Sequence, residues 1–340
     1  MEAENKQRNE AEIQDVEAYE SLGFTVKKRG IPDSFKVGRD AQLQLSKIER
    51  DLFTDLEDKE SGKYIISGLD KEIVVEKKIT ELDLTAFLFA VGKILYNQSY
   101  QSGNEEYNTG LSKTKADRVS KQLDKDVYCG DIVISLGDLC REAFGVDSPD
   151  FKQKKAMSTI IDTLHNNQVN IKFPNGDILE SYLCTKINTY TRKEDGAKLY
   201  QLHLNPIFCN NVKSNYGILP QDIIKRLSSA TKKKSAADYK LIRLLTNQDK
   251  RQPFTRTLEE LLNELNLMEA YKKERGRTEK QLMAIFEHMK SIGLVKEYEI
   301  DWITIRSKRA IQKVTFNLSS VQELLKENGD TIPPKNEKLG

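Results

Sequence analysis

The chain has 340 residues, of which 38% are hydrophobic and 31% charged, and its formal net charge is +2. This length exceeds what one ordinary core needs, so two domains are expected, and the composition excludes a disordered or membrane-embedded chain. The longest apolar stretch, residues 84–95, is too short to span a bilayer, and residues 1–20 contain no apolar signal-peptide core. We therefore expect a soluble, cytoplasmic protein that makes no contact with a membrane.

The first half of the chain predicts a lead-in followed by three helices and several strands. Residues 1–79 combine an acidic arm (1–20) with a small α+β segment, including a hairpin of 63–67 with 72–79. Capping-box spacings at Thr80–Asp83 and Ser135–Asp138 open the first two helices of a unit that covers residues 80–204. A polar run, residues 102–131, separates those helices as a loop or an interaction insert. The expected elements are helices over 80–95, 135–145 and about 150–166, then strands over 169–173, 178–190 and 198–204.

The second half repeats this order over residues 220–320. Ser235–Asp238 and Thr257–Glu260 have capping-box spacing, and the short helix after Thr257 has its apolar residues at the same offsets as its counterpart after Ser135. Residues 205–219 predict a linker, and residues 321–340 a disordered tail. The expected elements are a lead-in helix over 221–227, helices from 235, from 257 and over about 272–292, and strands over 294–305 and 311–318.

Helix, short helix, long helix and β-hairpin is the order of a winged helix-turn-helix. Its double occurrence predicts an α+β protein of two tandem winged helix-turn-helix domains with an acidic N-terminal arm. Residues 225–313 carry 21 Lys/Arg against 12 Asp/Glu, a net charge of +9, whereas the rest of the chain has 33 basic and 40 acidic residues, or −7. This asymmetry indicates a polyanionic partner for the basic half, with an uneven but solvated surface as the alternative.

The third helix of a winged helix enters the major groove of DNA. In the second unit its outer face carries arginines and amides that can read base edges, and His288 is expected there too, although any solvated amphipathic helix has a charged outer face. The hairpin tips are expected to contact DNA phosphates or the minor groove, and the lysine run before residue 235 is expected to bind phosphate. The predicted DNA-binding residues are Lys272, Lys273, Arg275, Arg277, Thr278, Lys280 and Gln281 on that helix; Lys152, Gln153, Lys154, Lys155, Ser158 and Thr159 on its first-unit equivalent; Arg192, Lys193, Arg306, Lys308 and Arg309 at the tips; and Lys232, Lys233 and Lys234.

The sequence predicts no metal site, no cofactor and no enzymatic activity. The four cysteines form no CxxC pair, and no histidine has zinc-finger spacing to a cysteine pair, so reduced, buried thiols are expected. There is no GxxxxGK[ST] loop, no GxSxG, no pair of histidines one residue apart as in rolling-circle nickases, and no HxxR as in tyrosine recombinases. Scattered carboxylates leave a two-metal site as the open alternative.

The stretches 227–267 and 271–294 contain a serine- and lysine-rich run, a helix, a leucine-rich short helix and a long helix. This arrangement resembles the theta-type plasmid replication initiators, the iteron-binding Rep family. The resemblance is architectural, covers about residues 80–318 and is strongest over the second unit. The first unit departs from it by the insert at 102–131.

The resemblance implies a protein that binds double-stranded DNA at the direct repeats of a replication origin. It further implies opening of an adjacent AT-rich segment, recruitment of host replication proteins such as the replicative helicase, and a dimer-to-monomer switch with a homodimer formed through the first unit. Two other interpretations stay open: a winged-helix transcriptional regulator or excision accessory factor, and a structural adaptor of a chromosome-organising complex. An adaptor would not need the +9 bias.

Overall fold

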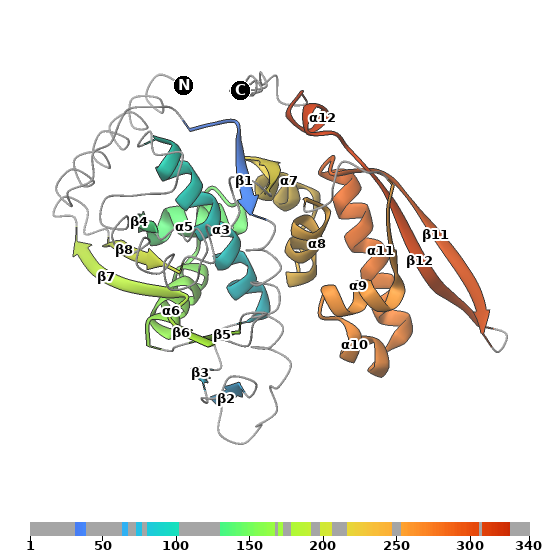
Figure 1. Cartoon of the computed structure of the whole chain (residues 1–340), viewed down its shortest axis with the longest axis horizontal. Coiled ribbons are helices and arrows are strands. Elements are labelled where there is room, and N and C mark those ends of the chain that lie inside the picture. The colour runs from blue at the N-terminus through green and yellow to red at the C-terminus, as the bar shows by residue number, and fades with distance from the viewer. Residues whose placement is uncertain are drawn as a thin grey trace.

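The computed structural model describes residues 31–38, 63–66, 73–76, 80–101, 130–166, 169–172, 178–191, 198–205, 216–246, 253–305 and 308–326. The predicted acidic arm and nearly all of the predicted insert lie outside these ranges. The described chain is a mixed α+β structure, with the elements of the first unit on the left of Figure 1 and those of the second unit on the right. Among the described residues, the helices are too short or too polar to cross a membrane.

In the described residues of the first unit there are three helices and two separate antiparallel sheets. One sheet has the strand order β4-β8-β7, and the other is the hairpin β5-β6. The helices and strands are α3 (Glu81–Gln101), β4 (Gly130–Ser135), α5 (Leu136–Phe144), α6 (Phe151–Asn166), β5 (Val169–Lys172), β6 (Ile178–Ser181), β7 (Cys184–Thr191) and β8 (Lys198–Leu204). The lead-in hairpin is confirmed as the antiparallel pair β2 (Lys63–Ile66) and β3 (Ile73–Glu76).

One strand prediction in the first unit is wrong. The segment 178–190 is two strands, β6 and β7, interrupted at Tyr182 and Leu183. There the backbone carbonyls of both residues accept hydrogen bonds from Asn205, at 2.9 Å from its side-chain amide and 3.0 Å from its backbone N–H. Because a residue beyond the end of β8 satisfies these carbonyls, the chain can change direction between the two strands.

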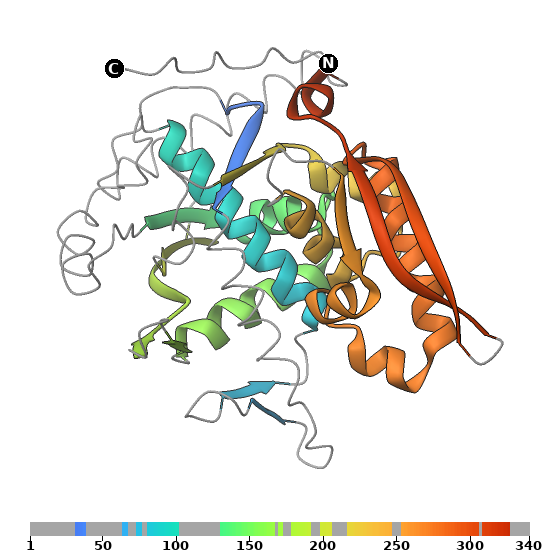
Figure 2. The same cartoon turned by 45° about the vertical axis from the view of Figure 1, so that its right-hand side comes forward.

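The second unit has its own helices and a three-stranded sheet of order β10-β12-β11. Its elements are β9 (Tyr216–Pro220), α7 (Ile223–Ala230), α8 (Ala236–Thr246), β10 (Phe254–Thr257), α9 (Leu258–Glu264), α10 (Met268–Lys273), α11 (Arg275–Ser291), β11 (Val295–Ile305) and β12 (Lys308–Leu318), followed by α12 (Val321–Lys326). Strands β11 and β12 confirm the predicted hairpin, which lies along α11 (Figure 2).

Several boundaries in the second unit differ from the sequence prediction, and β12 begins at Lys308 rather than at residue 311. The third helix does not begin at 272, because Glu274 has non-helical backbone angles (φ −140°, ψ 68°) and separates α10 from α11. The tail does not begin at 321, because Leu324 and Leu325 are buried in α12, whose start is capped by Ser320 and Glu323. Burying these leucines offsets the entropy cost of ordering one more helical turn.

The helix starts follow the local signals in the sequence. Thr257 and Glu260 form a complete capping box, with the Glu260 N–H donating to the Thr257 hydroxyl and the Thr257 N–H to the Glu260 carboxylate. Ser135 accepts from the Asp138 N–H at 3.0 Å in the same way. Helix α5 ends at Gly145, which has a left-handed backbone (φ 62°). These caps satisfy backbone groups that would otherwise have no partner at a helix end.

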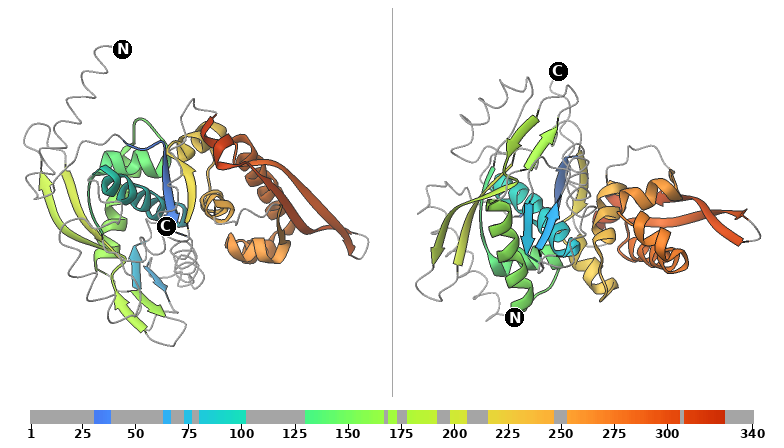
Figure 3. Two further views of the ribbon diagram at one scale, coloured as in Figure 1. Left: turned by 45° about the horizontal axis from the view of Figure 1, so that its top comes forward. Right: turned by 90° about the horizontal axis from the view of Figure 1, so that it is seen from below.

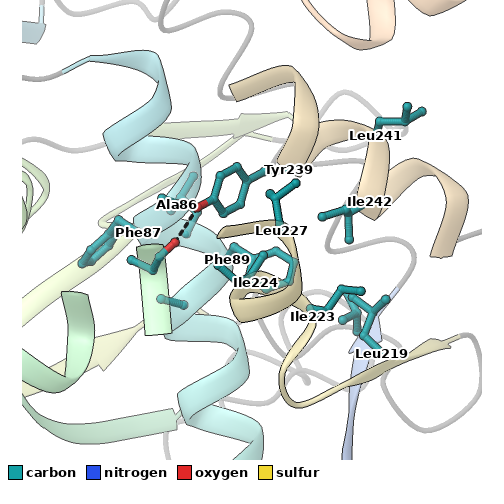
Figure 4. Packing of buried hydrophobic residues seen from close by; sticks show 14 of the residues in the cluster. Ala86, Phe87, Phe89, Leu219, Ile223, Ile224, Leu227, Tyr239, Leu241 and Ile242 are labelled. Carbon is teal, nitrogen blue, oxygen red and sulfur yellow. Dashed lines mark hydrogen bonds between the residues drawn. The ribbon is translucent and has the colours of Figure 1, made fainter. Parts of the chain in front are cut away.

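The two units pack on one another through a continuous apolar core. In the junction the Phe89 ring lies edge-on to Phe35 at 5.8 Å and to Tyr239 at 6.0 Å, and the Tyr239 hydroxyl donates to the Ala143 carbonyl at 2.7 Å (Figure 4). Strand β1 (Ser34–Gly38) of the lead-in pairs antiparallel with β9, which includes residues 216–219 of the predicted linker. The lead-in therefore joins the start of the second unit.

Candidate nucleic-acid interface

Helix α11 divides into a buried face and an exposed face. Its inner residues Leu282, Ile285, Phe286 and Met289 are at most 2% exposed, as the periodicity predicts. The Phe286 ring packs edge-on against Phe316 of β12 at 5.2 Å. This packing holds α11 on the three-stranded sheet and leaves its opposite face to solvent.

The exposed face carries basic residues near the N-terminal end of α11. The Arg277 side chain is 83% exposed, and its ion pair with Glu274, at 3.1 Å, is itself exposed. Such a pair contributes about 0–1 kcal/mol in water, so it does not hold the guanidinium away from a ligand. Lys280 is exposed and Gln281 half-buried on the same helix. The Arg277 guanidinium is therefore accessible from solvent.

The prediction that Thr278 and His288 lie on this exposed face is wrong. Thr278 is 2% exposed, and its hydroxyl donates to the Glu274 carbonyl at 3.1 Å, because it lies one turn before Leu282 on the inner stripe. The ring Nδ1 of His288 lies 2.8 Å from a carboxylate oxygen of Asp238, which is buried in α8. The imidazole thus ties α11 to α8 inside the protein.

Three other basic residues predicted to bind DNA, Lys272, Lys273 and Arg275, differ in their location and in their exposure to solvent. Lys272 and Lys273 are exposed but belong to the end of α10, where Lys272 pairs with Glu269 at 2.6 Å. Arg275 opens α11 and is only 38% exposed. Its guanidinium donates to Glu279 at 3.0 Å and to the backbone carbonyl of Arg309 at 3.1 Å. Arg275 is therefore engaged within the protein, unlike Arg277.

The β11–β12 hairpin, called the wing below, extends away from the rest of the chain in both views of Figure 3. Near its tip the Arg309 guanidinium stacks on the Trp302 ring at 4.4 Å. Trp302 is 38% exposed, and Arg309 is exposed. Of the other predicted tip residues, Arg306 lies outside the described residues and Lys308 is described only for its backbone.

Helix α6 is the first-unit counterpart of α11. Its inner residues Met157, Ile160, Ile161 and Leu164 are buried, and Lys152, Lys154 and Lys155 are exposed on its first two turns. Gln153 serves as a cap, because it exchanges hydrogen bonds with Asp150 at 2.8 and 3.0 Å. The Thr159 hydroxyl donates to the Lys155 carbonyl at 2.9 Å, and Ser158 is half-buried. The tip residues Arg192 and Lys193 lie outside the described residues.

The lysine run before α8 is divided between solvent and the junction of the two units. Lys232 and Lys233 are exposed, as a phosphate contact requires. Lys234 turns the other way and donates to the Phe144 carbonyl and to the Ser228 hydroxyl. Burial lowers the pKa of this ammonium. The prediction of Lys234 as a phosphate contact is therefore wrong, because the lysine satisfies the C-terminal end of α5 instead.

Two aromatic residues of this surface were not predicted as contacts. Phe151, at the start of α6, is 77% exposed beside three exposed lysines, where an apolar ring can contact a thymine methyl group. Trp302 accompanies Arg309 on the wing. The sequence did contain a signal for both residues. Each is an aromatic residue close to basic residues, at a position that the apolar periodicity of its segment does not place in the core.

The two cysteines in the described part of the chain are buried away from this surface. Cys140 and Cys184 are buried free thiols, and burial raises the pKa of each to about 12, which keeps them protonated. Cys129 and Cys209 lie outside the described residues. Within the described ranges, His, Cys, Asp and Glu side chains form no group of three or more that could hold a metal ion.

Comparisons with known proteins give a likeness among solved structures. No protein-family model matches the chain, and no curated protein matches it. Among solved structures, the chain is similar to the one titled "Crystal structure of Pi initiator protein in complex with iteron DNA". The TM-score is 0.41 at 10% sequence identity, over 85% of this chain and 97% of the other. At so low an identity, what this chain binds has to follow from its own residues.

Proposed function

We propose that the chain binds double-stranded DNA through two winged-helix units, with α11 and α6 in major grooves and the wing against the adjacent backbone or minor groove. The observation that carries this proposal is the division of α11, which buries its apolar face on the sheet and exposes Arg277 and Lys280 on the other. An exposed amphipathic helix of this kind, beside a projecting basic hairpin, fits the dimensions of a B-DNA major groove.

Charge supports the same proposal. Residues 225–313, which contain α11 and all charged residues of the wing, carry the net charge of +9. Lysines and arginines that neutralise phosphates release counterions, which provides sequence-independent affinity, whereas a guanidinium such as that of Arg277 can hold a guanine edge through two hydrogen bonds. Lys232 and Lys233 add phosphate contacts before α8.

We further propose that the DNA is the set of direct repeats at a plasmid replication origin. The protein would act there in the cytoplasm, without catalysing a reaction or binding a cofactor, by opening an AT-rich segment and recruiting host replication proteins such as the replicative helicase. A homodimer through the first unit belongs to the same proposal. This extension rests on the sequence resemblance to the theta-type initiators.

The test combines selection with footprinting. The full chain is used to select duplexes from a pool with about twenty randomised base pairs, and the DNA flanking its gene is footprinted. A selected motif that recurs as protected direct repeats beside the gene supports the origin-binding role. A single protected site at a promoter would favour the transcriptional regulator, and no enrichment from the pool would contradict DNA reading altogether.

A matched pair of lysine variants distinguishes contact through α11 from a general effect of net charge. Lys280→Ala removes an exposed cation from the groove-facing half of α11, whereas Lys290→Ala removes an exposed cation from the last turn of the same helix. The first change is expected to weaken binding about tenfold. The second is expected to leave affinity within about twofold, because Lys290 lies more than two turns away. Equal losses would mean that only net charge matters.

A further inference from the structure

Four residues connect α10, α11 and the wing at one point. They are Tyr271 at the end of α10, Arg275 and Glu279 in the first turns of α11, and Arg309 near the start of β12. Arg275 is central, because its side chain contacts the other three. Figure 2 shows how the wing runs beside α11, so this cluster lies where the two elements are adjacent.

The contacts of Arg275 use different parts of its side chain. Its Nε donates to the Glu279 carboxylate at 3.0 Å, and its Nη2 donates to the Arg309 carbonyl at 3.1 Å. Its guanidinium also lies 5.8 Å from the centre of the Tyr271 ring, and the Tyr271 hydroxyl is 3.3 Å from the same Glu279 oxygen. The Glu279 side chain is 20% exposed, so this ion pair is better shielded from water than the Arg277–Glu274 pair.

The carbonyl that Arg275 holds belongs to the residue whose side chain stacks on Trp302. A hydrogen bond at this carbonyl therefore fixes the backbone from which the Arg309 guanidinium projects. Near this end of the hairpin, Trp302 and Ile303 are both more than a third exposed. Without the bond, the tip would be free to bend relative to α11.

We propose that Arg275 is a positioning residue that locks the wing to α11 and so sets the spacing between Arg277 and Arg309 on bound DNA. This inference rests on the proposed DNA-binding function. An interface in which both elements are already fixed loses less conformational entropy on binding than one in which the wing must be ordered. Arg275 itself then makes no DNA contact.

The lock can be tested first without DNA, because Trp302 is the only tryptophan of the chain. Its fluorescence anisotropy and its quenching by acrylamide report on the wing alone. Arg275→Ala is expected to lower the anisotropy and raise the quenching, with the thermal melt near that of the wild type. Arg277→Ala is the matched control, since it removes an exposed arginine two positions away that has no contact with the wing among those described, and it should leave both signals unchanged. An unchanged Trp302 signal in Arg275→Ala would overturn the lock.

The second arm measures coupling on DNA with a duplex selected by the wild type from the randomised pool. Arg309→Ala should weaken binding about tenfold in the wild-type background but less than about threefold when Arg275 is alanine, because the wing is then already displaced. The control cycle pairs Lys280→Ala with Arg309→Ala, whose effects should add. Additive effects of Arg275 and Arg309 would overturn the positioning role.

Arg275→Lys separates geometry from charge. A lysine keeps the positive charge, but its single ammonium cannot replace the fork that reaches both Glu279 and the Arg309 carbonyl. The proposal expects Arg275→Lys to resemble Arg275→Ala in both arms, and wild-type behaviour of the lysine variant would overturn it. If the wild type selects no DNA, the proposed function and the positioning role both fail, whereas the fluorescence arm still decides whether the lock exists.

Discussion

Replacing Gly145 with alanine is expected to destabilise the folded chain by about 2–5 kcal/mol. Gly145 ends α5 with a left-handed backbone (φ 62°), and its N–H donates to the Arg141 carbonyl at 2.8 Å. An added Cβ would lie 2.4 Å from the carbonyl oxygen of Ile224 and 2.7 Å from its carbon. These atoms belong to the backbone of α7 in the second unit, so no side chain can rotate to make room.

The magnitude combines two effects of different origin. A left-handed conformation costs a residue with a Cβ about 1–2 kcal/mol, and inserting a methyl group into a packed site costs about 1–3 kcal/mol. The assay is urea denaturation of the full chain, followed by far-ultraviolet circular dichroism, with the midpoint and the slope compared with those of the wild type. The free energy of unfolding should fall without a change in slope.

Gly92→Ala is the matched control. Gly92 lies inside α3, and nothing is within 4 Å of the position of its added Cβ, so alanine should stabilise the chain by about 0.5–1 kcal/mol. If Gly145→Ala costs less than about 1 kcal/mol, α5 and α7 are not in contact at this point and the packing of the two units described above is refuted.

Three other outcomes are expected. The logarithm of DNA affinity should fall with the logarithm of salt concentration with a slope of about −5 or steeper, and a slope near zero in a salt titration would contradict phosphate binding. Arg277→Ala should reduce the free energy of binding to the selected duplex by about 1–3 kcal/mol and relax the base preference at one position. Lys232→Ala should weaken binding to all DNA sequences equally and reduce the magnitude of the salt slope by about 0.9. Affinities for selected and random duplexes at several salt concentrations measure both, and an equal loss on both duplexes for Arg277→Ala would mean that α11 does not read bases. Deleting residues 1–20, which hold seven acidic and two basic residues, should leave affinity in a gel shift unchanged or raise it, and a clear loss would show that the arm takes part in binding or folding.

Much of the local structure could be predicted because its causes lie within one turn of helix or one hairpin. The capping box at Thr257 and Glu260 needs only two side chains three residues apart, and the buried stripe from Leu282 to Met289 follows from helical periodicity. Thr278 belongs to the same stripe, so its burial was also readable from spacing. The break at Glu274 was not, because no proline marks it, the nearby Gly276 lies inside α11, and the turn depends on how α10 packs beside α11.

The role of single polar side chains depended on partners far away in the sequence. Lys234 has the composition of a phosphate-binding lysine, yet its ammonium binds the carbonyl of Phe144, ninety residues earlier in the chain. His288 lies at an apparently outward position of α11, yet it contacts Asp238 of α8. In each case a partly buried polar group found its partner only when two separate elements packed together.

Arg275 and Arg277 illustrate which properties of a residue the sequence determines and which depend on the tertiary structure. By itself the sequence determined that both are arginines at the basic start of a helix whose other face is apolar, because charge and periodicity are local properties. Only the tertiary structure decided that Arg275 holds Glu279 and the wing while Arg277 faces solvent at 83% exposure. The physical reason is that a guanidinium binds whichever acceptors the fold places within about 3 Å of it, and the acceptor on the wing comes from a strand 34 residues further along the chain.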